Sequence, residues 1–183
     1  LSKADLSEAN LVKVGLQQAN LTGAILDGAH LNEGILTHTH LDGASLSDAR
    51  LHHIVASDAD FSGAIMVGAD FTGARLDGAR ILKATLSDAL LRGAQLKRVD
   101  LRGATLARAD LSHAVFWSAD LEEANLAGAS LVEADLRYAR LTNARLSRRG
   151  ARADLRGAKF NRQTILPDDD PWTPELVARV TAQ

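Results

Sequence analysis

The sequence contains no cysteine and few aromatic residues, and both absences narrow the choice of fold. Without cysteine, neither a disulfide framework nor a thiolate metal site can form, and the composition leaves the redox compartment undetermined. Aromatic residues make up only 4% of a chain that is 46% hydrophobic. A core must therefore be built from small aliphatic side chains, and leucine and alanine supply most of them. At 183 residues the chain has the length of one ordinary domain.

Membrane and strong charge signals are also missing. No apolar run approaches the roughly 18 residues that a membrane span needs, and no signal-peptide pattern opens the chain. A cytoplasmic location is therefore favoured. The net charge of −2 indicates no partner, and direct nucleic-acid binding is not expected. The charge is uneven, because residues 1–91 carry 6 Lys/Arg and 11 Asp/Glu, whereas residues 92–183 carry 15 and 12.

A five-residue repeat runs through almost the whole chain. Every fifth residue from Leu1 to Leu146 is large and apolar, except Ala56, and two residues earlier 24 of 29 positions hold alanine. Neither an α-helix nor a flat strand keeps a period of five on one face. The chain must therefore turn a quarter revolution every five residues. Glycine recurs two residues after the leucine, as at Gly63 and Gly68, which indicates a corner with positive φ.

These residues resemble the pentapeptide-repeat family, whose pattern is A-(D/N)-L-x-x, as in Ala4-Asp5-Leu6. The match covers Leu1 to about Ile165. The resemblance implies an all-β solenoid, namely a right-handed quadrilateral β-helix of about eight coils. Residues 20 apart should then be vertical neighbours.

The β-helix is expected over residues 1–166, with a register slip at 147–154. After Leu146 the pattern restarts one residue out of phase at Ala153-Asp154-Leu155, and Ile165 is expected at a core position. At the one missing leucine, Ala56, the large Ile54 stands where alanine is expected. Because close packing conserves volume, this favours a repacked coil over a ligand cavity.

Residues 167–183 are expected to form a C-terminal cap with a short helix at about 174–181. Thr173, Pro174 and Glu175 give the helix a favourable start. The helix would cover the open solenoid end, which otherwise invites aggregation, and dimerisation through the same surface is the alternative. The residues expected on this surface are Trp172, Leu176, Val177 and Val180.

The N-terminal end shows no equivalent cap. Leu1 is already in phase with the repeat, which favours a piece of a longer protein whose open end pairs with upstream sequence or a second copy. Dimerisation through either end of the solenoid is therefore an open alternative.

Catalytic and cofactor motifs are absent. The sequence holds no nucleophile elbow, P-loop, dinucleotide-binding loop or H-E-x-x-H, and a leucine-packed solenoid offers no deep pocket. We expect no enzyme activity and no cofactor. The histidines favour cross-coil pairs, such as His53 with Glu33 and His113 with Glu133, because zinc needs three or four convergent ligands.

One candidate partner surface surrounds Trp117. Lys97, Trp117 and Arg137 stand 20 residues apart, so the indole should lie between two cations in a cation–π stack. With Val115 and Tyr138 nearby, the same residues are typical of a hot spot that binds a partner protein.

Two weaker surface features accompany it. Outward apolar residues recur on two sides of the rod, either as a binding patch or as ordinary β-branched strand residues. They are Ile25 and Ile65 on one side and Ile35, Val55 and Val115 on another. The C-terminal coils are basic, and could dock an acidic protein or phosphates, or keep the edge soluble. The residues concerned are Arg137, Arg140, Arg145, Arg148, Arg149, Arg152, Arg156, Lys159 and Arg162.

The predicted function is a non-catalytic interaction or scaffold module for an unknown protein partner. Its composition suggests a bacterial source and the C-terminal domain of a larger protein. The first alternative, implied by the resemblance, is a DNA-mimicking inhibitor of DNA gyrase that gives quinolone resistance. That role requires a continuous negative surface, and the outward residues Asp60, Arg80 and Asp100 mix both signs. The second alternative is a metal-binding or enzymatic accessory domain.

Overall fold

Each five-residue unit folds as a tight turn followed by one extended residue. In the unit that begins at Leu6, the amide of Ala9 donates to the carbonyl of Leu6 at 3.1 Å and closes a β-turn. The third turn residue, Glu8, has φ of 56°. The next residue, Asn10, forms a parallel bridge with His30 in the following coil. The unit thus supplies a corner and one rung of a ladder.

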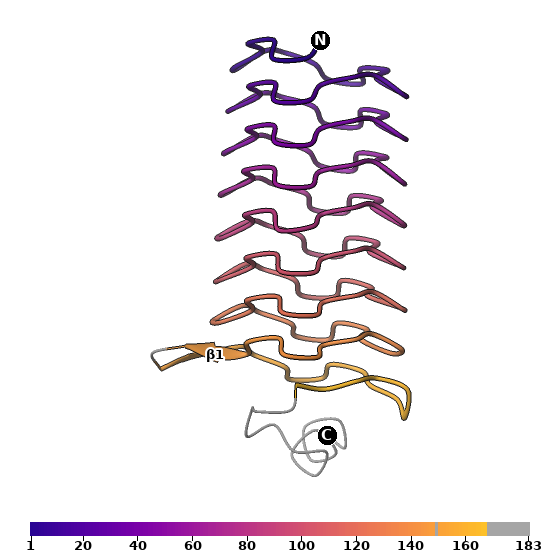
Figure 1. Ribbon diagram of the computed structural model, residues 1–183, viewed down its shortest axis with the longest axis vertical. Helices are drawn as coiled ribbons and strands as arrows, with labels where there is room; N and C mark the ends of the chain where they lie inside the picture. The colour runs from indigo at the N-terminus through magenta and orange to yellow at the C-terminus, as the bar shows by residue number, and fades with distance from the viewer. Residues whose placement is uncertain (149, 168–183) are drawn as a thin grey trace.

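Ladders on four sides stack the coils into a right-handed quadrilateral β-helix. The computed structural model describes residues 1–148 and 150–167, and Figure 1 shows their coils stacked along one axis. The amide of Ile25 donates to the carbonyl of Ala4 at 2.9 Å, and the carbonyl of Ile25 accepts from the amide of Leu6 at 2.7 Å. One of the four ladders runs through Asn20, His40, Asp60, Arg80, Asp100, Asp120, Arg140 and Ile165.

The core consists of the leucine and alanine positions of the repeat. From Leu21 to Ala158 these side chains are buried, as the period of five requires. Phe61 and Phe71 meet edge to face, with ring centroids 6.1 Å apart. The buried hydroxyl of Thr39 donates to the carbonyl of Leu16 at 2.7 Å, so this polar group is satisfied.

The coil that lacks a leucine is repacked. Ala56 and Ile54 are both fully buried. In the neighbouring coil, Gly34 stands in the same column as Ile54, and a Cβ at this glycine would lie 2.9 Å from the carbonyl oxygen of Leu31 and 3.1 Å from the side chain of Leu36. The large Ile54 and the small Ala56 thus exchange sizes within one coil, as close packing favours.

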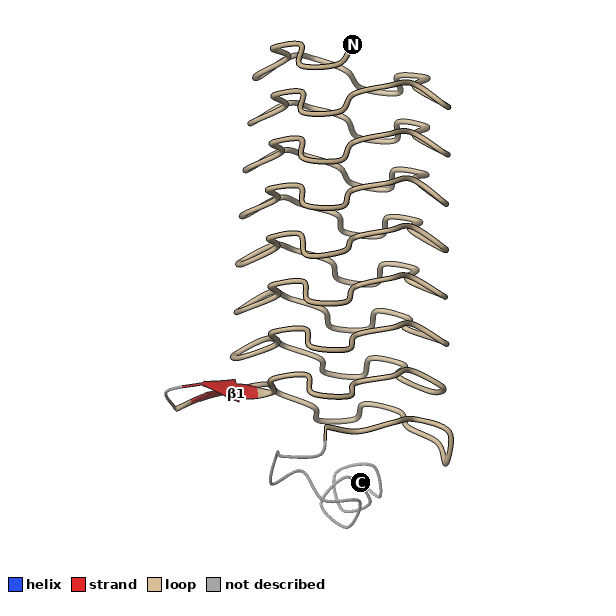
Figure 2. Ribbon diagram, in the orientation of Figure 1, coloured by secondary structure: helices blue, strands red, loops and turns tan. Residues whose placement is uncertain are grey.

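A β-hairpin takes up the residues where the sequence loses phase. Strand β1 (Ser147–Arg148) pairs antiparallel with β2 (Ala151–Arg152). Figure 2 shows the hairpin projecting from one corner of the stack. At its base the amide of Ala153 donates to the carbonyl of Leu146 at 2.7 Å, which is the bond that closes an ordinary corner. The hairpin is therefore an enlarged corner.

A second irregularity follows in the last described coil. Asp135 bridges Lys159, but Arg140 bridges Ile165, so this side contains one residue more than the coil before it. Ile165 occupies the bridging position and is 49% exposed. The expectation that Ile165 continues the core was therefore wrong. The turn itself keeps four residues, since the amide of Thr164 donates to the carbonyl of Asn161 at 3.0 Å, so the extra residue is Phe160, between the bridging Lys159 and this turn.

Two expectations meet the limits of the described chain. The C-terminal helix at about 174–181 lies outside the described residues. Among residues 1–148 and 150–167, no helix is long and apolar enough to cross a membrane.

Candidate functional site

The candidate partner surface lies on one corner of the rod, which we call the Trp117 corner. Trp117 follows the core residue Phe116, so the repeat places it at the first position of a turn, pointing outward. Lys97 and Arg137 take the same position in the coils before and after it. The coils are held in register by bonds such as that from the amide of Ser118 to the carbonyl of Arg137 at 3.2 Å.

The two exposed aromatic rings of this corner contact each other. Trp117 and Tyr138 meet edge to face, with centroids 5.5 Å apart and an interplanar angle of 70°. They are 47% and 44% exposed. Tyr138 has φ of 64°, and the small Ser118 lies one coil before it in the same column. The pair is thus fixed by the backbone and remains open to solvent.

The guanidinium of Arg137 binds Asp135 and does not form the expected cation–π stack with Trp117. Its guanidinium donates to Asp135 through two bonds, Nε to Oδ1 at 2.8 Å and NH2 to Oδ2 at 2.6 Å. These hydrogen bonds lower the pKa of Asp135 and raise the pKa of Arg137. The indole therefore has Tyr138 as its aromatic partner, and Arg137 is held beside it as part of a fork.

The sequence carries a signal for this fork that the spacing of 20 does not reveal. The tripeptide Asp-Leu-Arg occurs three times, and in each copy the arginine returns to the aspartate two residues before it. The bridging aspartate also accepts the backbone amide of that arginine. The three copies are 100–102, 135–137 and 154–156.

A hollow of about 370 Å³ opens beside the aromatic pair. Val115 and Gln95 line it from the adjacent side, and Lys97 lies at its edge. Val115 and the two aromatic rings give the hollow an apolar part, and Gln95, Lys97, Asp135 and Arg137 line the rest of it; a mixed lining of this kind is typical of a protein interface. The structure thus brings together all five residues expected on this surface.

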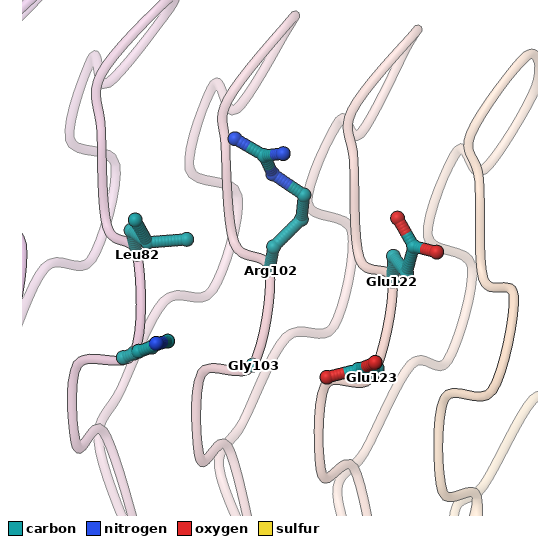
Figure 3. Close-up of a pocket in the computed structure, with 6 residues that line it drawn as sticks. Leu82, Arg102, Gly103, Glu122 and Glu123 are labelled. Atoms are coloured by element: carbon teal, nitrogen blue, oxygen red, sulfur yellow. The ribbon is translucent and has the colours of Figure 1, made fainter.

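A second hollow, of about 310 Å³, lies on another corner and was not expected. Figure 3 shows Arg102 and Glu122 on successive coils, with Gly103 and Glu123 beside them. Gly103 lacks a side chain and so leaves a gap between Lys83 and Glu123. The glycine between two charged residues at 20-residue spacing was the available signal.

The hollow around Gly103 is part of a network of cross-coil ion pairs. Arg102 binds Asp100 at 2.7 Å and lies 3.9 Å from Asp120, and hydrogen bonding to Asp100 raises the pKa of Arg102. Arg140 binds Glu122 at 2.8 Å. Opposite charges lie side by side here, so the hollow presents no single sign to a ligand.

Two of the six histidines, His52 and His113, form pairs with carboxylates, whereas the expected pair of His53 with Glu33 does not form: the ring of His53 lies over Gly73, and Glu33 lies 3.4 Å from Lys13. His113 lies 3.1 Å from Glu133, as expected, and His52 lies 2.7 Å from Asp70, a pair that spacing of 20 did not predict. Among residues 1–148 and 150–167, no group of three or more His, Cys, Asp or Glu side chains could hold a metal ion.

The basic C-terminal coils are partly neutralised. Arg137 and Arg156 bind the aspartates of their own tripeptides, and Arg140 binds Glu122. Arg145 and Arg152 are exposed. Arg149 lies outside the described residues, as do Trp172, Leu176, Val177 and Val180, the residues expected on the cap or dimer surface.

Comparison with known families decides the origin of this architecture. The family described as pentapeptide repeats (8 copies) matches residues 1–28, 24–54, 57–93, 94–121 and 109–148. The chain belongs to the pentapeptide-repeat family. Comparison with curated protein sequences gives no match.

Solved pentapeptide-repeat structures resemble the chain. HetL from the cyanobacterium Nostoc sp. strain PCC 7120, involved in heterocyst differentiation regulation, is 34% identical with a TM-score of 0.80, over 90% of this chain and 76% of HetL. Rfr23 from the cyanobacterium Cyanothece 51142 is 35% identical with a TM-score of 0.51, over 53% of this chain and 63% of Rfr23. QnrB1, a plasmid-mediated fluoroquinolone resistance protein, is only 15% identical with a TM-score of 0.48 over 87% of this chain and 90% of QnrB1, and its activity does not transfer by this similarity.

Proposed function

We propose that this pentapeptide-repeat chain is a non-catalytic recognition module that binds a partner protein through the Trp117 corner. The observation that carries the proposal is the exposed Trp117–Tyr138 pair, held edge to face beside an open hollow. Trp, Tyr and Arg are the residues most enriched among those that dominate binding energy in protein interfaces.

The backbone of the corner favours tight recognition. Both rings sit on turns that are bonded to the next coil, and the Asp135–Arg137 fork is already formed. Little conformational entropy is therefore lost when a partner docks, which is how preorganisation raises affinity. In residues 1–148 and 150–167 the interior is filled by buried leucine and alanine side chains, which supports a binding role over catalysis.

The similarity to HetL supports a regulatory role of this kind. That protein is described as involved in regulating differentiation, and it shares the fold over most of both chains. The ion pairs on the remaining faces weigh against DNA mimicry, since Arg80 binds Asp60 at 3.1 Å and interrupts a negative surface. A continuous negative face would be needed to imitate a phosphate backbone.

The test is a pull-down from the source cell with the wild-type chain and the double variant Trp117→Ala/Tyr138→Ala. A matched control is Ile25→Ala/Ile65→Ala, which removes two exposed apolar side chains from another side of the rod. We expect a specific partner to be retained by the wild type and the control and lost by the aromatic variant. With the purified partner, the loss of affinity should be about 30-fold or more. Equal capture by all three chains would contradict the proposal.

A further inference from the structure

At the two outward turn positions of the Trp117 corner the charge changes sign half-way along the rod, although the exposed Arg75, at a bridging position, lies in the acidic half. Asp58 and Asp77 lie on the coils toward the N-terminus, and Lys97 and Arg98 lie on the next coil. The carboxylate of Asp58 lies over Gly78, which is in the next coil toward the C-terminus. None of these four side chains forms an ion pair with another described residue, although such pairs are common on the other corners.

Apolar side chains flank the charge reversal at matching distances. Ile35 and Val55 lie on the coils before it, and Ile35 is 41% exposed. Val115, Trp117 and Tyr138 lie on the coils after it. Together they form what we call the corner strip, a run of one segment from each of six successive coils. Its segments are 35–38, 55–58, 75–78, 95–98, 115–118 and 135–138.

We propose that the corner strip is a self-complementary surface through which two copies of the chain pack side by side and antiparallel. The inference goes beyond the proposed recognition role, because it assigns a second copy of the chain, in addition to the partner protein, to the same corner. A two-fold axis perpendicular to the rod, between the coils of Asp77 and Lys97, makes each column of residues face itself in reverse order. Isologous contacts of this kind are the commonest in homodimers.

The reversed columns pair unlike charges. Asp77 of one copy faces Lys97 of the other, and Asp58, whose carboxylate reaches over Gly78, faces Arg98. Each pair occurs twice because of the two-fold axis. A parallel arrangement would place Lys97 on Lys97 and Asp77 on Asp77, which is repulsive.

The same register brings apolar and small groups together at the second and fifth segments, whereas at the strip ends Ile35 faces Asp135 and Tyr138 faces His38. Val55 of one copy faces Val115 of the other, next to the hollow of about 370 Å³. The indole of Trp117 faces Ser57, a small residue that leaves room for the ring. Trp117 of each copy thus faces a surface of the other copy on which its indole can be buried, as hot-spot residues require.

The size of the strip predicts a weak, reversible dimer. Five coil steps of about 4.8 Å give a length of ~24 Å, and four residues span about 13 Å, so the strip covers about 300 Å² on each copy. The total of about 600 Å² is below that of standard specific interfaces, so only a weak, transient dimer is expected. Association should therefore depend on protein concentration and weaken at high salt.

Charge exchange tests the register of this dimer. Asp58→Arg and Arg98→Asp both suit the backbone, because Asp58 and Arg98 have φ of 56° and 55°, and Asp88 and Arg108 occupy equivalent corners at 61° and 60°. Sedimentation velocity of the full chain from about 1 to 200 µM should show a monomer–dimer equilibrium for the wild type. Each single variant should raise the dissociation constant at least about 10-fold, through repulsion of like charges.

Recombining the two changes should restore the dimer. The Asp58→Arg chain presents two cations at this contact and the Arg98→Asp chain two carboxylates, so a mixture of the two should associate within about 3-fold of the wild type. The double variant should behave in the same way. The control is Asp48→Arg, because the carboxylate of Asp48 also lies over a glycine of the next coil, Gly68, on a different corner. This variant should dimerise as the wild type does.

Two results would overturn the proposal. A wild type that stays monomeric over the whole concentration range would exclude a dimer, and a dimer insensitive to Asp58→Arg would place the contact elsewhere, such as at the rod ends. Neither result affects the recognition role, because the pull-down reads a different partner. If Trp117→Ala/Tyr138→Ala still captured the partner while the charge variants abolished the dimer, only the recognition role would be wrong.

Discussion

At the residue scale, the corner position is the most demanding in the repeat. It holds glycine at positive φ in many units, but 19 other residues, including Lys83 and Tyr138, adopt positive φ at the same position. A side chain there costs about 1–2 kcal/mol relative to an ordinary conformation. The hydrogen bonds between coils fix the corner regardless of the residue, so the fold tolerates this cost many times over.

A pair of glycine substitutions separates backbone strain from crowding. At Gly63 (φ 66°) an added Cβ would meet nothing within 4 Å, whereas at Gly68 (φ 67°) it would meet the carboxylate of Asp48. We expect Gly63→Ala to lower the free energy of unfolding by about 1 kcal/mol, and Gly68→Ala to lower it further, because Asp48 must also move. Urea unfolding of the two variants measures the difference. Equal losses would mean that the carboxylate moves without cost.

The sequence predicted these corners well and their side-chain partners poorly. The period of five requires a quarter turn at each unit, and glycine at a fixed offset indicates positive φ, so fold and columns followed directly. The partner of Arg137 did not, because the spacing of 20 pointed to Trp117 while the nearer Asp135 offered a two-bonded contact. A charged pair within one turn wins over a cation–π contact between coils, since both partners are already held close.

At the scale of the element, the coil that contains Ala56 tests how strictly core volume is conserved. Ile54→Ala should lower the free energy of unfolding by about 2–5 kcal/mol, because it leaves a cavity in a fully buried site. Ala56→Leu alone should cost about 1–3 kcal/mol through overpacking. The double variant restores the repeat pattern in this coil and should recover most of both losses.

Thermal and denaturant unfolding of the two single variants and the double variant give the coupling energy. Ala74→Val is a control for overpacking one coil away, in the column of Ile54, where no compensating small residue stands. If the changes in the free energy of unfolding of the Ile54 and Ala56 substitutions were strictly additive, the two side chains would not share one space in the core.

Irregular elements were only partly predictable. The break in phase after Leu146 gave the position of the extra residues, since the pattern resumed at Ala153. The shift before Ile165 was invisible, because Phe160 and Ile165 keep a spacing of five and both are apolar. In the structure the half-buried Thr164 takes the alanine position, and its hydroxyl donates to the carbonyl of Leu136 at 3.0 Å. A polar residue that can satisfy its own hydroxyl is hard to recognise as a core residue from sequence.

At the scale of the whole molecule, acid should weaken the rod through its aspartates. Arginine hydrogen bonds lower the pKa of Asp88, Asp100, Asp135 and Asp154. Because an unfolded aspartate titrates near pH ~3.9, the folded chain binds fewer protons than the unfolded chain around that pH. The stabilisation is present above the unfolded pKa and is lost as the pH falls through the lower folded pKa values.

We therefore expect the midpoint of thermal unfolding to fall as the pH is lowered from about 4 toward 2. Arg102→Met removes the hydrogen bonds that lower the pKa of Asp100 and should make this fall smaller. Arg92→Met is the control, since Arg92 is exposed, forms no ion pair with a described residue and lies outside the corner strip. An acid response that is identical in both variants would contradict the assignment of the effect to arginine–aspartate pairs.

The hairpin of β1 and β2 has a further consequence for how such rods change over time. Its base keeps the hydrogen bond of an ordinary corner, from Ala153 to Leu146, and the bridge from Ser130 to Asp154 forms as though nothing had been added. Corners can thus gain or lose segments while the sides continue to stack. New loops can therefore arise at any coil without a change in the core. A foreign epitope grafted between Ser147 and Arg152 would be displayed at a fixed position relative to the Trp117 corner.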